Sequence, residues 1–153
     1  MMRRSLVGKV VLVTGAAGGL GAALCRAFSA AGARVVGMDL DQARLSSLLA
    51  QLPAGTLAIG GPQHGDISDA QACQRAIAQT LAHFGALDVL VNNAGISHRS
   101  LLQDTDPGVI RRVMEVNFFG AMQMTHAALP HLLAGRGVVA AISSVAGYAP
   151  LLG

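Results

Sequence analysis

One stretch near the start of the chain constrains the fold more than any other. The apolar run VVLV at 10–13 leads directly into the glycine-rich segment TGAAGGLG at 14–21. Apolar residues then recur at helical spacing, and the predicted inner face is Leu20, Ala23, Leu24, Ala27, Phe28 and Ala31. A buried strand that leads through a glycine turn into a helix is the opening unit of a dinucleotide-binding βαβ fold. We therefore expect cofactor phosphates at this helix start, where N–H groups and the helix dipole favour an anion.

The glycines of this segment are expected to serve different purposes. Gly15 allows a tight turn, Gly18 and Gly19 let the backbone approach a pyrophosphate, and Gly21 lets the helix pack closely on the sheet. The spacing T-G-x-x-x-G-x-G is neither the strict G-x-G-x-x-G fingerprint nor a P-loop, which requires a following Lys. Taken alone, the segment is also compatible with a flexible turn. The candidate cofactor-binding residues here are Gly15, Ala17, Gly18, Gly19, Leu20 and Gly21.

The composition excludes several classes of protein. The 153 residues are 52% hydrophobic and 12% charged, which suits one folded domain and excludes a disordered chain. No apolar run reaches the 18 or more residues of a membrane span, and Lys9 interrupts the only segment that resembles a signal peptide. The net charge of +3 is scattered, so we expect neither a nucleic-acid partner nor a membrane partner.

The cysteines and histidines give no sign of a special site. Cys25 and Cys73 lie far apart in helical patterns, which favours small buried residues in a reducing cytoplasm over a disulfide. The five histidines show no metal-ligand spacing, so no metal site is expected. We therefore expect a cytoplasmic location.

The chain alternates predicted strands and helices without a repeat or a linker. The strands are predicted at residues 10–13, 33–38, 57–59, 87–91 and 137–142. This order predicts an α/β fold, a Rossmann-type doubly wound parallel sheet with right-handed crossovers that stops after its fifth strand. Ligands of such a sheet bind at the carboxyl ends of the strands.

Helix boundaries are predicted from capping residues and prolines. A helix begins at Asp41, with Leu45, Leu48, Leu49 and Leu52 on its apolar face. Ser68 and Gln71 are predicted to form a capping box for the next helix. The longest helix begins at Asp106 and Pro107 and is predicted to kink or end at Pro130; its periodic positions include Val109, Ile110, Val113, Met114, Asn117 and Met122.

Polar residues follow several of the predicted strands. Asp39 lies where a carboxylate can accept hydrogen bonds from the adenosine ribose and repel a 2′-phosphate, which favours NAD over NADP; helix capping is its alternative role. Asp66 and Ile67 could reach the adenine amino group, or could be plain loop residues. Asn92 and Asn93 could join strand ends or contact the cofactor.

Together these motifs resemble a classical short-chain dehydrogenase/reductase over essentially the whole chain. The resemblance rests on the segment at 14–21, Asp66, NNAG at 92–95, Asn117 and ISSVAG at 142–147. It implies that Ser144 is the catalytic serine, which polarises the oxygen of an alcohol or ketone substrate. It also implies that Asn117 holds a water in the proton relay, that Asn93, Ala94 and Gly95 bind cofactor, and that the protein is a homo-oligomer.

One part of the family pattern is missing from these 153 residues. The family's general acid/base is a Tyr with a Lys four residues later, expected thirteen residues after Ser144 and thus beyond Gly153. Tyr148 is the only tyrosine and no Lys follows it, so we interpret it as a loop residue. We therefore expect the amino-terminal part of a longer NAD(P)-dependent oxidoreductase, inactive by itself. A dinucleotide-binding or regulatory module without catalysis is the alternative.

Overall fold

A single parallel sheet forms the centre of the molecule. The computed structural model describes residues 5–53 and 55–144, and its five strands are ordered β3-β2-β1-β4-β5. Every neighbouring pair of strands is parallel, which confirms the predicted fold class. The strands are β1 (Val10–Thr14), β2 (Arg34–Asp39), β3 (Thr56–Gly60), β4 (Val89–Asn92) and β5 (Val138–Ala141).

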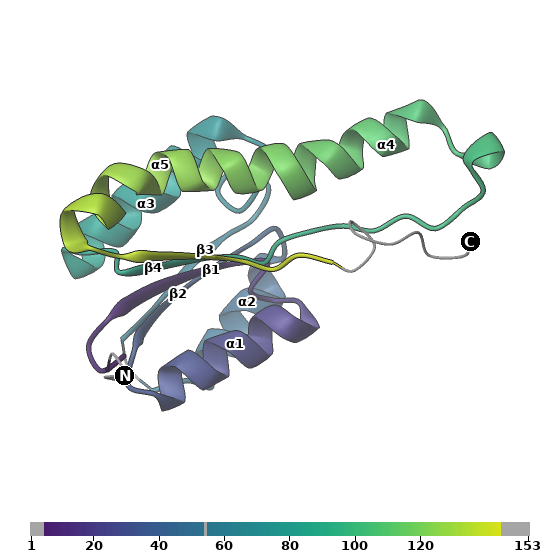
Figure 1. Cartoon of the computed structure of the whole chain (residues 1–153). Coiled ribbons are helices and arrows are strands. Elements are labelled where there is room, and N and C mark those ends of the chain that lie inside the picture. The colour runs from purple at the N-terminus through teal and green to yellow at the C-terminus, as the bar shows by residue number, and fades with distance from the viewer. Residues whose placement is uncertain (1–4, 54, 145–153) are drawn as a thin grey trace.

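Helices cover both faces of this sheet. Figure 1 shows α1 and α2 on one face and α3 and α5 on the other, with α4 and α5 forming a nearly continuous rod. A short 3₁₀ helix, η1, precedes this rod, and a π-helical segment, η2, lies within it. The bounds are α1 (Gly19–Ala30), α2 (Gln42–Leu49), α3 (Ala70–Phe84), η1 (Leu102–Asp104), α4 (Pro107–Met114), η2 (Glu115–Gly120) and α5 (Ala121–Gly135).

Alternating residues of the strands build two separate hydrophobic cores. Along β1, Val10 and Leu12 pack toward α3 and α5, whereas Val11 and Val13 pack toward α1 and α2. This alternation follows from the two-residue period of a strand. Cys25 and Cys73 are free, buried and in opposite cores, as the sequence predicted for small buried residues.

Several helix predictions are confirmed and others are wrong. The leucine face of α2 is buried as expected, whereas α1 buries Gly21 and Cys25 and leaves Leu20 53% exposed. The cap of α3 is Asp69, which accepts a hydrogen bond from the Gln71 N–H, so the predicted Ser68 capping box is wrong. Of the two outcomes predicted at Pro130, a kink or an end, the end is wrong, because α5 continues past Pro130 to Gly135.

One edge of the sheet is apolar and open. β5 pairs with β4 on one side only, and all four of its residues are exposed in the part of the chain that the structure describes. Val138 and Val139 are 47% and 41% exposed. Across residues 5–53 and 55–144, no helix is long and apolar enough to cross a bilayer.

Candidate functional site

Two adjoining pockets lie where the direction of the strand order reverses. β1 lies between β2 and β4, and such a switch point is where doubly wound sheets bind ligands. One pocket has a volume of about 140 Å³ and the other about 440 Å³, and Gly15, Asp39, Ala94 and Gly95 line both. Every predicted cofactor-binding residue except Gly19 lines one pocket or the other: Gly15, Ala17, Gly18, Leu20, Gly21, Asp39, Asp66, Ile67, Asn93, Ala94 and Gly95.

Two glycines are required by the protein's own packing. Gly15 has a φ of +64°, and a Cβ there would lie 2.7 Å from the Cα of Ala94. A Cβ at Gly21 would overlap the carbonyl oxygen of Gly15 and lie 2.9 Å from the Asn93 Nδ2. The strand-to-helix turn therefore packs directly against the loop that follows β4.

Two further glycines have no such role. A Cβ at Gly18 would have no neighbour closer than 3.4 Å, and one at Gly19 would meet nothing within 4 Å. Gly19 is the first residue of α1, and its N-cap Gly18 provides no side-chain hydrogen bond. Packing within the protein thus leaves open space beside an uncapped helix start, which suits an anion that approaches the backbone closely.

The carboxyl ends of β1 and β4 are joined by the Thr14 hydroxyl and the Asn93 amide. The Thr14 Oγ1 accepts hydrogen bonds from the N–H groups of Asn93 and Ala94, both at 3.0 Å, and donates to the Val91 carbonyl. The Asn93 Nδ2 donates to the carbonyls of Thr14 and Gly15. Asn93 therefore joins strand ends, whereas Asn92 joins the end of β4 to α5 by donating to the Thr125 hydroxyl.

Asp39 joins the glycine turn to the end of β2. Its carboxylate accepts hydrogen bonds from the N–H groups of Ala17 and Asp41, each at 2.9 Å. Asp41 is the residue that caps α2, by accepting from the Arg44 N–H. The Arg44 side chain lines the larger pocket, and its guanidinium has no hydrogen bond or ion pair within the described ranges. This positive charge was not expected from the sequence.

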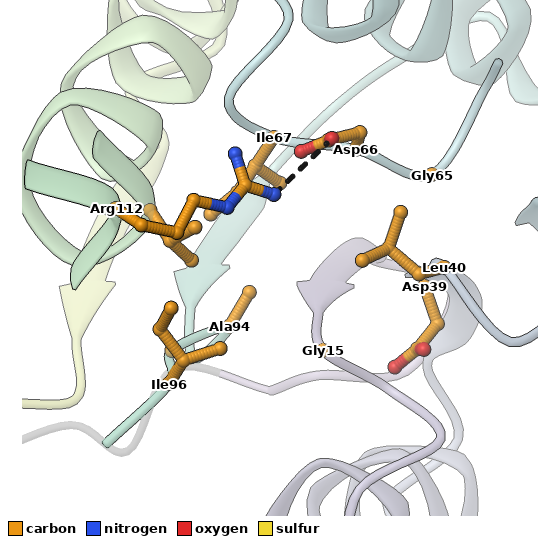
Figure 2. A pocket seen from close by; sticks show the side chains of 11 residues that line it. Gly15, Asp39, Leu40, Gly65, Asp66, Ile67, Ala94, Ile96 and Arg112 are labelled. Carbon is orange, nitrogen blue, oxygen red and sulfur yellow. Dashed lines mark ion pairs between the residues drawn. The ribbon is translucent and has the colours of Figure 1, made fainter. Parts of the chain in front are cut away.

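An ion pair lies on the side of the smaller pocket that faces away from the glycine turn. Asp66 and Arg112 both line it, with 3.6 Å between the Asp66 Oδ2 and the Arg112 Nη2, as Figure 2 shows. Partial burial raises the pKa of Asp66, but hydrogen bonds from Ser68 and the charge of Arg112 outweigh it, so the pKa lies below its usual value. Sequence reasoning missed Arg112 because α4 reaches this loop only through tertiary packing.

The two candidate catalytic residues lie at different edges of this region. Asn117, in η2, accepts a hydrogen bond from the Ile96 N–H and donates one to the Ile96 carbonyl, both at 2.8 Å. Its Oδ1 lies beside Gly95 of the pockets. Ser144 is exposed beyond β5, two residues after Ile142 of the larger pocket. Tyr148 and the VAG segment at 145–147 lie outside the described residues.

No cluster that could hold a metal ion occurs among the described residues. The residues that line the two pockets offer backbone N–H groups, three carboxylates and two guanidinium groups. That combination suits a ligand with phosphates and hydroxyl groups.

Comparisons with known proteins agree with this geometry. The family model described as short chain dehydrogenase matches residues 9–153. The chain is 42% identical over 153 residues to dehydrogenase/reductase SDR family member 7B of Bos taurus, covering 95% of this chain and 47% of the relative. It is 41% identical over 141 residues to L-fucose dehydrogenase of Mus musculus, covering 92% of this chain and 50% of that relative. The chain thus spans about half the length of the relatives it matches.

A solved structure extends the likeness to three dimensions. The 3-ketoacyl-(acyl-carrier-protein) reductase from Brucella melitensis, complexed with NADH, matches with a TM-score of 0.85 at 33% sequence identity. The match covers 93% of this chain and 60% of that chain.

Proposed function

Because this chain belongs to the short-chain dehydrogenase family, we propose that its switch-point pockets bind NAD and that the whole protein oxidises an alcohol or reduces a ketone. When bound, the nicotinamide accepts or supplies the hydride. The observation that carries the proposal is the pair Gly18 and Gly19. Neither residue is needed as glycine by internal packing, and both border open space at the start of α1.

The surrounding residues suit the other parts of a dinucleotide. The N–H groups at the start of α1 would hold the pyrophosphate, Asp39 would accept hydrogen bonds from the adenosine ribose, and Asp66 with Ile67 would contact the adenine. The complex of the Brucella melitensis reductase with NADH supports a nicotinamide dinucleotide as the ligand.

Preference for NAD over NADP rests on charge at the ribose. Asp39 would repel a 2′-phosphate, and its two hydrogen bonds from the backbone fix the carboxylate in place. Arg44 lines the same pocket and would attract that phosphate. We propose that the repulsion of a 2′-phosphate by Asp39 outweighs its attraction by Arg44, because Asp39 lines both pockets and Arg44 lines only the larger one.

We propose that these 153 residues alone do not complete the catalytic machinery. Ser144 would donate a hydrogen bond to the substrate oxygen, but a proton donor held beside a lysine is also needed. The only lysine, Lys9, pairs with Asp88 at the amino ends of β1 and β4. The pockets lie at the opposite, carboxyl ends of the strands. This position of Lys9 favours a second candidate function for the 153 residues alone, which is dinucleotide binding without turnover.

The binding proposal is tested by a side chain at Gly19. We expect Gly19→Val to abolish NADH binding in a fluorescence titration, since its side chain would crowd a phosphate held by the N–H groups at the start of α1, beside the larger pocket that Gly18 lines. The urea midpoint should stay near the wild-type value, because nothing lies within 4 Å of a Cβ at this position. Ala30→Val, at the other end of α1, is the control. NADH binding that survives Gly19→Val would contradict the proposal.

The catalytic proposal is tested with a panel of alcohols and NAD. We expect no turnover by the 153 residues, because general acid/base catalysis alone contributes about 10² to 10⁴-fold. Turnover that disappears in Tyr148→Phe would instead identify Tyr148 as the proton donor.

A further inference from the structure

Arg112 is the one residue of α4 that lines the smaller pocket. Its Nη1 donates a hydrogen bond to the Ser68 Oγ at 3.0 Å, and its Nη2 lies 3.6 Å from the Asp66 Oδ2. The guanidinium therefore spans two residues of the loop between β3 and α3. Arg112 also lines the pocket itself, and Figure 2 shows it opposite Gly15 and Asp39.

The two oxygens of Asp66 have different partners. Oδ1 accepts hydrogen bonds from the Ser68 N–H at 2.9 Å and the Ser68 hydroxyl at 2.7 Å. Oδ2 faces Arg112 at the longer distance of an ion pair. A carboxylate oxygen can accept two hydrogen bonds, so Oδ2 keeps the capacity to accept one from a ligand in the pocket.

The loop that carries Asp66 has little freedom on its other side. Gly65 passes so close to the carbonyl of Asp39 that a Cβ on Gly65 would overlap it. Ile67 is 4% exposed and belongs to the core beneath α3 and α5. Backbone packing thus fixes the loop, while the direction of the Asp66 carboxylate depends on Ser68 and Arg112.

We infer that Arg112 is a positioning residue for adenine recognition: together with Ser68 it turns the Asp66 carboxylate so that Oδ2 accepts a hydrogen bond from the adenine amino group. The inference rests on the proposed function and deepens it. Arg112 also joins α4 to the part of the pocket where the adenine would lie, since it contacts both Asp66 and Ser68. The lowered pKa of Asp66 supports a carboxylate that stays ionised and able to accept.

The test compares NADH with reduced nicotinamide hypoxanthine dinucleotide, which has a carbonyl in place of the adenine amino group. A hydrogen bond to a charged acceptor changes affinity by about tenfold or more, so the wild-type chain should bind NADH at least about tenfold more tightly. In Arg112→Met we expect the ratio of the two affinities to fall close to one. Ser68→Ala should lower the ratio in the same direction, and Arg112→Lys should give an intermediate value, because an ammonium group keeps the charge without the fork of two donors.

Arg111→Met is the matched control, since it removes a neighbouring arginine of α4 that does not line this pocket. Urea unfolding of each variant shows whether it is folded, and Arg112→Lys and Ser68→Ala carry the test if Arg112→Met is not. An unchanged ratio of the two affinities in the Arg112 variants would overturn the inference, including the case in which both nucleotides bind equally more weakly. A wild-type chain that binds both nucleotides equally would overturn the inference alone, whereas one that binds neither would overturn the proposed function as well.

Discussion

At the scale of single residues, the Thr14 hydroxyl joins the end of β1 to the loop after β4 through several hydrogen bonds. It is 1% exposed and takes part in three hydrogen bonds, two from N–H groups of the loop after β4 and one to the Val91 carbonyl. Valine has nearly the same shape but no hydroxyl, so Thr14→Val leaves two partly buried N–H groups without their acceptor. The strand ends that hold Gly15 and Ala94 together depend on this one oxygen.

We expect Thr14→Val to lower the free energy of unfolding by about 1 kcal/mol, the lower end of the cost of leaving hydrogen-bonding groups unsatisfied, because the two N–H groups are partly buried. Urea denaturation measures the change, and Thr14→Ser is the control because it keeps the hydroxyl. A loss as large in Thr14→Ser would assign the effect to packing of the methyl group instead.

The second residue prediction concerns cofactor choice. Placing a carboxylate beside a 2′-phosphate costs several kcal/mol, so the chain should bind NADH far more tightly than NADPH, and Asp39→Ala should narrow the gap. The double variant Asp39→Ala/Arg44→Ala should lose part of the gained NADPH affinity, because Arg44 lines the same pocket. Fluorescence titrations with both cofactors measure these changes. Equal affinities in the wild-type chain would contradict the assignment of Asp39.

Residues with a local sequence signal could be predicted, and those that act through tertiary contacts could not. The glycine spacing at 14–21 and Asp39 at a strand end lead directly to pocket-lining positions. Arg112 lies 44 residues from its partner Ser68, and nothing in the surrounding sequence marks it. Arg44 also went unnoticed, because a solvent-facing arginine is ordinary on a helix.

At the scale of elements, the rod formed by α4, η2 and α5 explains a wrong prediction. The periodic positions of the predicted helix included Ile110, Met114 and Met122, which are 44%, 46% and 51% exposed. The buried positions are instead Val116, Gly120, Met124, Ala128 and Leu132. A π-helical segment takes more residues per turn than an α-helix, so a face extrapolated at 3.6 residues per turn does not continue through η2. The strands, with their simple two-residue period, were predicted within two residues of their observed ends.

We expect the η2 segment to hold the loop after β4 through Asn117. Asn117→Ala removes both hydrogen bonds to Ile96, so amide hydrogen exchange at Ile96 should become at least about tenfold faster, as for a loss of local protection worth 1.4 kcal/mol. Asn117→Asp is the control, since it keeps an acceptor for the Ile96 N–H and loses only the donor. Exchange unchanged in Asn117→Ala would mean that the loop is held by other contacts.

At the scale of the whole molecule, two apolar surfaces lie uncovered in the described structure. One is the open edge of β5, and the other lies on the rod, where Phe118 and Phe119 are 55% and 40% exposed and pack edge to face on each other. An open, apolar strand edge and an exposed apolar helix face both favour association. The family resemblance that implies a homo-oligomer is consistent with these surfaces.

We therefore expect the 153-residue chain to self-associate, with a mass above that of a monomer in size-exclusion chromatography with light scattering. Phe118→Lys should reduce association through the rod, and Val139→Lys should reduce association through the strand edge. The variant with the larger effect identifies the surface responsible. A monodisperse monomer at high concentration would show that neither surface drives assembly.

The placement of one cysteine in each core gives the two layers separate chemical reporters. Burial raises the pKa of Cys25 to about 11 and that of Cys73 to about 12, the latter with help from nearby carboxylates. At pH 8 each folded thiol is therefore protonated as well as shielded, and reaction with a thiol reagent requires the surrounding layer to open. Labelling at Cys25 then measures how often α1 and α2 separate from the sheet, and labelling at Cys73 does so for α3 and α5. Because dinucleotide binding would involve the start of α1, NADH should slow the first rate more than the second.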